Sequence, residues 1–197
     1  MAFSNVKLYD VKEKFGLIED KQDIFPSLQA IQASDWLLDM IEMSSELPLN
    51  SEKAKSEFIV SPILLEVWKR NDKRFSIFSG VTLDVDAELK GECDFILSKL
   101  PKNQELEAPI FTLIEAKDDN IRNGIGQCVM QMYASQKFNE IKKQAISTIY
   151  GCVTTGEAWQ FIRLEDKAVV FHEKRLLLID LDNILGAFQY IVDKNYK

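Results

Sequence analysis

The sequence predicts an α/β fold of the α+β type, in which helices pack against a mixed sheet. Three observations support it: short runs of strand length between 75 and 116, a long helical pattern over about 121–143, and a further strand pattern over 147–153. A strand, a crossover helix and a further strand indicate a parallel pair with a right-handed connection. We therefore expect one mixed sheet with helices against its faces.

Residues 1–50 carry scattered helical patterning and are expected to form a short helical extension. One helix follows a cap at Ser34 or Asp35, and Pro26 and Pro48 mark turns. From 51 to 70, apolar side chains recur at helical spacing, which predicts a helix. Because proline lacks an N–H, Pro62 is expected to kink this helix or mark a local break.

Three strands are expected next. Residues 75–83 alternate between apolar and small or polar side chains, and 86–91 form a turn that leads to a strand over about 92–97. A polar loop over 101–108 precedes the run 110–116. That run is nearly all apolar, so it is expected to lie at the centre of the sheet.

The second half of the chain continues the mixed pattern. The helix over about 121–143 has apolar residues on one stripe, and the strand over 147–153 follows it. Turns at 155–157 and 165–167 link strands over 158–164 and 168–172. A closing helix is expected over 181–193, which adds C-terminal strands and a helix to the fold.

Length and composition favour a single domain over residues 1–197. A chain of this length buries roughly 70% of its unfolded surface, and the 46% hydrophobic and 28% charged content is ordinary for a globular protein. No apolar run approaches the roughly 20 residues that span a bilayer, and the first residues lack the pattern of a signal peptide. We therefore expect a cytoplasmic protein with no membrane partner.

The cysteines and the single histidine limit the chemistry. Cys93, Cys128 and Cys152 are odd in number and lie in apolar stretches, which favours reduced core thiols over disulfides or a zinc site. One histidine, His172, excludes any mechanism that needs two, and it is expected to be a polar cap on a strand end.

The net charge of −7 argues against a nucleic-acid substrate, because an acidic protein has no overall field that attracts phosphates. Charge is nevertheless local, and bound cations reverse its sign. Basic residues cluster at Lys69, Arg70, Lys73 and Arg74, at Lys142 and Lys143, and at Lys174 and Arg175. Each cluster is either a solvated element end, which at a helix C-terminus complements the dipole, or part of a phosphate track.

Three polar side chains stand at the ends of two adjacent apolar strands: Asp94, Glu115 and Lys117. Glu115 and Lys117 are two residues apart and share a face, and a hairpin-like return brings Asp94 alongside. Two carboxylates about 4 Å apart repel by roughly 4 kcal/mol at an effective dielectric near 20. A cation or a proton between them would offset this, which predicts a divalent metal site; the alternative is an ordinary exposed strand end.

This arrangement resembles the PD-(D/E)xK superfamily of restriction-endonuclease-like nucleases. The Glu-x-Lys signature is Glu115-Ala116-Lys117, and Asp94 holds the Asp position, preceded by Cys93 in place of proline. The resemblance covers about residues 51–165. It implies a restriction-endonuclease-like αβββαβ core, with residues 1–50 as the extension, in one of the small stand-alone bacterial members.

The resemblance also implies roles for these residues. The carboxylates of Asp94 and Glu115 and the backbone carbonyl of Ala116 would bind Mg²⁺ or Mn²⁺ through oxygen. Lys117 would orient the attacking water and offset charge in the transition state. The metal would lower the pKa of that water.

Two further residues complete the expected site. Family members commonly take a fourth carboxylate from the first core helix, where Glu57 and Glu66 are the candidates. Glu57 is favoured as a catalytic and metal-binding residue because Glu66 has Arg70 at i+4, which explains it as an ion pair. Gln127 matches a glutamine that many members carry early on the next helix, although it also suits the polar edge of that helix.

The function expected from the resemblance is that of a magnesium-dependent deoxyribonuclease, an enzyme that hydrolyses the phosphodiester bonds of DNA. RNA is left open as a substrate, and so is a homodimer, because restriction-type action often uses dimers. The first alternative is a catalytically inactive nuclease-fold module that binds nucleic acid or a protein. The second is a purely structural domain in which the motif is coincidental.

Overall fold

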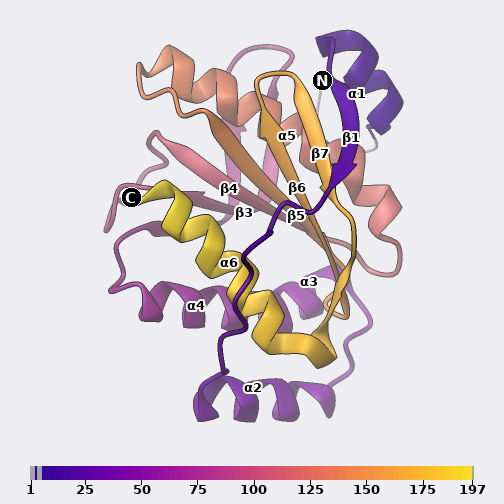
Figure 1. Cartoon of the computed structure of the whole chain (residues 1–197), viewed down its shortest axis with the longest axis vertical. Coiled ribbons are helices and arrows are strands. Elements are labelled where there is room, and N and C mark those ends of the chain that lie inside the picture. The colour runs from indigo at the N-terminus through magenta and orange to yellow at the C-terminus, as the bar shows by residue number, and fades with distance from the viewer. Residues whose placement is uncertain (1–2, 4–5, 197) are drawn as a thin grey trace.

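The computed structural model describes residue 3 and residues 6–196, and its centre is one mixed β-sheet (Figure 1). The eight-stranded sheet has the order β1-β7-β6-β5-β4-β3-β2, and β8 pairs with β6 beside this path. The expected mixed α/β class is therefore confirmed.

The strands that the sequence predicted all form, with small changes of boundary. They are β2 (Ser76–Asp84), β3 (Lys90–Ser98), β4 (Ile110–Ala116), β5 (Thr148–Thr154), β6 (Ala158–Glu165) and β7 (Ala168–His172). β2, β3 and β4 pair antiparallel, and β4 pairs parallel with β5. The predicted parallel pair is thus confirmed, with α5 (Ile121–Ile141) as its crossover helix.

The expectation of a purely helical extension over residues 1–50 is wrong for the part that the structure describes. The segment contains α1 (Leu8–Phe15) and α2 (Asp35–Ser45), but also the strand β1 (Ile18–Gln22), which pairs parallel with β7. Residues 1, 2, 4 and 5 of the extension lie outside the described residues. All of β1 is exposed, so its residues show no alternation that could reveal a strand.

The predicted break near Pro62 is confirmed. The helix over 51–70 divides into α3 (Glu52–Lys55), the π-helix η1 (Ser56–Val60) and α4 (Ser61–Arg70), with Pro62 in the first turn of α4. Pro62 has no N–H to donate to the carbonyl of Phe58, four residues earlier. The hydroxyl of Ser44 lies 2.9 Å from that carbonyl oxygen and 2.6 Å from the carbonyl oxygen of Met40, and its single proton serves one of them at a time.

Two hydrophobic cores lie on opposite faces of the sheet. One contains α4 and the closing helix α6 (Leu181–Asn195), which follows β8 (Leu176–Leu177) and the short 3₁₀ helix η2 (Leu178–Asp180). The other contains α1 and α5. β4 is buried along its whole length between these layers, as its apolar run predicted.

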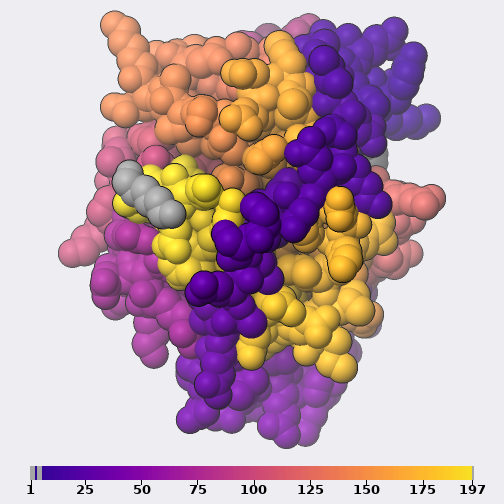
Figure 2. Space-filling view, in the orientation of Figure 1, coloured from indigo at the N-terminus to yellow at the C-terminus, as the bar shows by residue number. Residues whose placement is uncertain are grey.

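An extended strap, residues 23–34, crosses the outer side of α6 on its way from β1 to α2 (Figures 1 and 2). Ile31 N–H donates to the carbonyl of Asp182, and Ala33 N–H donates to its carboxylate. A Cβ at Gly186 would lie 2.2 Å from the carbonyl oxygen of Gln29, so only glycine allows this close contact.

The three cysteines are free and buried, as expected of core thiols. His172 ends β7, where its Nδ1 accepts from Ile24 N–H at 3.3 Å, and burial lowers the pKa of its imidazole. It therefore acts as the predicted polar cap. In the part of the chain that the structure describes, no helix is long and apolar enough to cross a membrane.

Candidate functional site

The candidate site is built where β3 and β4 separate. Their pairing ends at Phe95 and Ile114, so Asp94 and Glu115 are the next residue on each strand. The side chain of Asp94 turns toward β4, and its Oδ2 accepts a 2.7 Å hydrogen bond from Ala116 N–H. The fold therefore brings the two predicted carboxylates to one place.

Glu115 is the buried centre of the cluster, with 1% of its surface exposed. Its Oε1 lies 2.7 Å from the Nζ of Lys117, and its Oε2 accepts a 2.9 Å hydrogen bond from Nε2 of Gln131. Both carboxylate oxygens thus have a partner, one of them a cation.

Lys117 is held in place by backbone and packing as well as by charge. Its N–H donates to the carbonyl of Thr154, which continues the β4–β5 pairing by one residue. Its methylene stem lies against Gly124 on α5, where a Cβ would be 2.9 Å from Lys117 Cγ and 2.7 Å from Cγ1 of Val153. This contact explains the glycine near the start of α5.

The carboxylate that reaches the cluster from the first core helix is that of Glu52, the first residue of α3. Its Oε2 lies 3.6 Å from Lys117 Nζ, and its charge also acts on Asp94. Neither of the predicted candidates, Glu57 and Glu66, contacts the cluster. Glu57 is half exposed and pairs with Lys53, whereas Glu66 is buried against Arg70 and Ser34.

The π-helix η1 explains why Glu57 does not reach the cluster. A stripe that placed Glu57 on one face with Val60, Leu64 and Trp68 would need unbroken 3.6-residue periodicity, and η1 contains five residues of wider winding just before α4. The stripe therefore loses its phase. In the sequence, Glu52 directly follows the Ser51 cap and precedes Lys55 by three residues. Both features are ordinary for the first turn of a helix, so neither indicates a functional site.

Gln131, one turn after Gln127, is the glutamine that contacts Glu115. Gln131 is fully buried, and its Nε2 also approaches the carbonyl of Glu92 at 3.3 Å. The predicted residue Gln127 lies half-buried earlier on α5. Residues four apart lie on the same face of a helix, so the contact with Glu115 is displaced by one turn along the axis of α5 and stays on the predicted face.

The electrostatics of the cluster are unbalanced. Burial and the nearby charge of Asp94 raise the pKa of Glu115 to about 7, and burial raises the pKa of Asp94. Burial alone would lower the pKa of Lys117, but the charges of Glu115, Glu52 and Asp94 outweigh it and raise that pKa. Three carboxylates face one ammonium, so a fully ionised cluster carries a charge of −2, which favours a further cation or a bound proton.

The donor set suits a hard divalent cation. It contains the carboxylates of Asp94 and Glu115 and the carbonyl of Ala116, and the buried Oε1 of Gln131 has no partner in the described structure. Mg²⁺ is usually held by one or two carboxylates and keeps several waters. Within residues 3 and 6–196, no group of three or more His, Cys, Asp or Glu side chains is arranged to hold a metal alone, so the backbone carbonyl and water would complete the coordination.

Several of the basic residues singled out in the sequence have local partners. Arg70 pairs with Glu66, Arg74 pairs with Asp193, and the Nζ of Lys73 lies 5.3 Å from the centre of the Trp68 ring. Lys142 lies over Phe138 in the same way. These contacts favour the interpretation of these residues as structural charges over that of a phosphate track.

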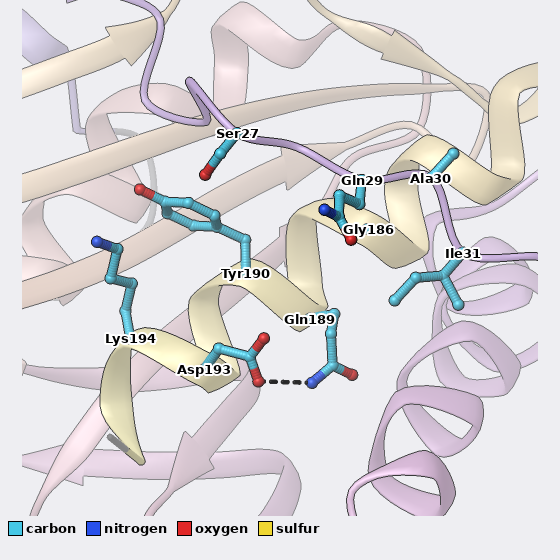
Figure 3. A pocket seen from close by; sticks show the side chains of 9 residues that line it. All are labelled: Ser27, Gln29, Ala30, Ile31, Gly186, Gln189, Tyr190, Asp193 and Lys194. Atoms are coloured by element: carbon cyan, nitrogen blue, oxygen red, sulfur yellow. Dashed lines mark hydrogen bonds between the residues drawn. The ribbon is translucent and has the colours of Figure 1, made fainter.

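A cavity of about 320 Å³ lies between the strap and α6 (Figure 3). The lining side chains include Gln29, Gln189 and Asp193, and Gln189 donates to Asp193. None of the described residues that line it belongs to the predicted site. The cluster of Asp94, Glu115 and Lys117 therefore lies at the strand ends, away from this cavity.

Comparisons of the chain with protein-family models, with curated proteins and with solved structures find no significant match.

Proposed function

We propose that the protein is a metal-dependent nuclease of the PD-(D/E)xK type. The observation that carries this proposal is the convergence of Asp94, Glu115 and Lys117 at the ends of two adjacent strands, around a carboxylate that is 1% exposed. Glu115 is buried, Asp94 is half-buried and Glu52 is half exposed, so the repulsion is strongest between Glu115 and Asp94. A divalent cation bound between these two carboxylates would offset that repulsion.

The order of elements supports the same superfamily. α4, β2, β3, β4, α5 and β5 follow one another in the αβββαβ order, and the four strands are neighbours in the sheet. The site lies at the end of β4, before the crossover helix. We infer a restriction-endonuclease-like core over about residues 51–165.

Asp94, Glu115 and the carbonyl of Ala116 would hold Mg²⁺ or Mn²⁺. When bound, the metal supplies Lewis-acid activation of a water and stabilises charge on the phosphate. Glu52 takes the place that the sequence analysis gave to Glu57, because its carboxylate already lies against Lys117.

Lys117 holds the ammonium that orients the attacking water and offsets charge that develops on the phosphate oxygens. Its pKa is raised, so it stays protonated and acts through charge, not as a general base. Gln131 fixes one oxygen of Glu115, which leaves its other oxygen for Lys117 or the metal.

The substrate that we propose is DNA, and RNA is the second choice. We further propose that the protein acts in the cytoplasm, either as a monomer or as a homodimer. The test is cleavage of plasmid and single-stranded DNA with Mg²⁺ or Mn²⁺ by the wild type and by Asp94→Ala and Lys117→Ala. The wild type should cleave, and both variants should fold and lose activity. Equal cleavage by all three proteins would rule out the proposed nuclease activity.

A catalytically inactive nuclease-fold module is the second candidate function. The net charge of −7 favours it, and so do the ion pairs of Arg70 with Glu66 and of Arg74 with Asp193, because they reduce the attraction for phosphates. Calorimetric titration with Mn²⁺ separates the two candidates. A module without catalysis predicts no saturable binding at the cluster.

A further inference from the structure

A second cavity, of about 310 Å³, lies beside the candidate site. Ile41 from α2, Leu49, Ile59 from η1 and Leu178 from η2 form its apolar walls, and Ser45 and Thr155 add hydroxyl groups. This volume is at the lower end of the roughly 300–1,000 Å³ that small-ligand sites span.

Lys55 links this cavity to Asp118, the neighbour in sequence of Lys117 in the carboxylate cluster. Its side chain lines the cavity, and its Nζ donates to the carbonyl of Asp118 and lies 3.3 Å from Oδ1 of that residue. Asp118 directly follows Lys117, and Lys55 is one turn after Glu52 on α3. A ligand in the cavity would therefore lie next to the groups that we assign to hydrolysis.

The turn between β5 and β6 forms the other side. Gly156 has a φ of +83°, and a Cβ added to it would lie 3.7 Å from Cβ of Lys55 and 3.8 Å from Cβ of Ile59. The hydroxyl of Thr155 accepts from Ala158 N–H and remains able to donate to a ligand. The cavity thus has rigid backbone on one side and aliphatic side chains on the other.

We propose that this cavity binds one unpaired base of a single-stranded DNA substrate, next to the phosphodiester at the cluster. A base has two apolar faces, which suit the aliphatic walls, and a polar edge that could accept from the hydroxyl of Thr155 and donate to the oxygens of Ser45 and Glu157. The hydroxyl of Ser45 donates to the carbonyl of Glu42 at 2.6 Å, so its oxygen is left as an acceptor. The carboxylate of Glu157 disfavours a phosphate inside. A base that is stacked in a duplex cannot enter, so the inference predicts a preference for single strands. It rests on the proposed function and specifies its substrate.

The test uses binding without cleavage. In a Glu115→Gln background, affinity is measured by fluorescence anisotropy with a labelled single-stranded oligonucleotide and with a blunt duplex of the same length. Ser45→Trp fills the cavity from its exposed rim, and Met43→Trp, two residues earlier on α2 and exposed, is the matched control. We expect Ser45→Trp to weaken single-strand binding about tenfold, because the indole would fill the space of the base and remove its contacts with the aliphatic walls. Met43→Trp and duplex binding should not change.

Equal affinity for the two DNA forms, or equal effects of the two tryptophans, would overturn the inference. The outcome is independent of the nuclease test. If the cavity variant weakens single-strand binding but the wild type cleaves nothing, the base site stands and the nuclease proposal fails. If the wild type cleaves single strands and duplex alike and Ser45→Trp has no effect on either rate, the nuclease stands and the base site fails.

Discussion

Two glutamates are buried to nearly the same extent, Glu115 at 1% and Glu66 at 2% exposure, yet their surroundings differ. Glu66 meets one guanidinium, with Arg70 Nε at 2.7 Å, and one hydroxyl donor, Ser34. Glu115 also meets one cation and one neutral donor, but two more carboxylates, Asp94 and Glu52, share its cation.

The difference separates a structural ion pair from a candidate site. Arg70 also donates to the carbonyl of Gln32, so the Glu66 pair joins the strap, the cap of α2 and α4. The cluster around Glu115 also joins elements, through Gln131 of α5, Asp94 of β3 and Glu52 of α3, but it contains three carboxylates and one ammonium. One cation balances Glu66, whereas the surplus of carboxylates around Glu115 favours a bound cation or a proton.

The largest expected effect comes from removing the two cations in turn. Lys117→Ala should lower DNA cleavage by about 10³-fold or more while the protein stays folded, because Lys117 acts on the reacting groups. Arg70→Ala should leave cleavage near the wild-type rate and destabilise the protein by about 2 kcal/mol, because it removes a hydrogen bond to a buried charge. Cleavage assays measure the rate, and urea denaturation measures the free energy of unfolding. If the two variants lost activity and stability to the same extent, Lys117 and Arg70 would not differ in role.

The next effect is the pH dependence of stability without metal. The pKa of Glu115 is about 7 in the folded protein and 4.5 ordinarily, so between these values the folded state keeps a proton that the unfolded chain releases. The stabilisation is fully present below about pH 4.5 and is lost as the pH rises through 7. The loss is on the order of 3 kcal/mol.

Urea denaturation in EDTA at several pH values measures this loss. The difference between the wild type and Glu115→Gln isolates the contribution of Glu115, since other titrating groups are shared. A difference that stays constant from pH 4.5 to 7 would contradict the raised pKa.

A smaller effect is expected where Gly124 allows Lys117 to pack. In Gly124→Ala the new Cβ would press on Lys117 and Val153, so the ammonium should shift and cleavage should fall about tenfold. The free energy of unfolding should fall by about 1–2 kcal/mol, because overpacking against the buried Val153 outweighs the higher helix propensity of alanine. Asn123→Ala, at the exposed neighbouring position, is the control and should cleave at the wild-type rate.

The smallest expected effect is on the free energy of unfolding, which should change in opposite directions when Glu66 and Glu115 are replaced by glutamine. At pH 8 without metal, Glu66→Gln should lower the free energy of unfolding by about 1 kcal/mol, because it weakens a charged hydrogen bond. Glu115→Gln should leave it unchanged or raise it by about 1 kcal/mol, because it removes a repelled charge. Thermal and urea unfolding of the two variants compare them directly.

The sequence predicted the strands best where they are buried on both faces or on alternate residues, because burial then leaves a pattern of apolar residues. β4 was bounded correctly because every residue of Ile110–Ala116 is buried, and β1 was missed because none of its residues is. The central triad was found because its residues are close in sequence and lie on paired strands. Glu52 was missed because it is 65 positions from Lys117, and η1 moved Glu57 away from the expected face.

The most direct test of the central claim is calorimetric titration with Mn²⁺. The account predicts saturable binding to the wild type and to Glu66→Gln, and loss of that binding in Asp94→Ala and Glu115→Gln, with all four proteins folded. Binding that survives Glu115→Gln, or a wild type that takes up no metal, would contradict the claim that these two strand ends hold a divalent cation.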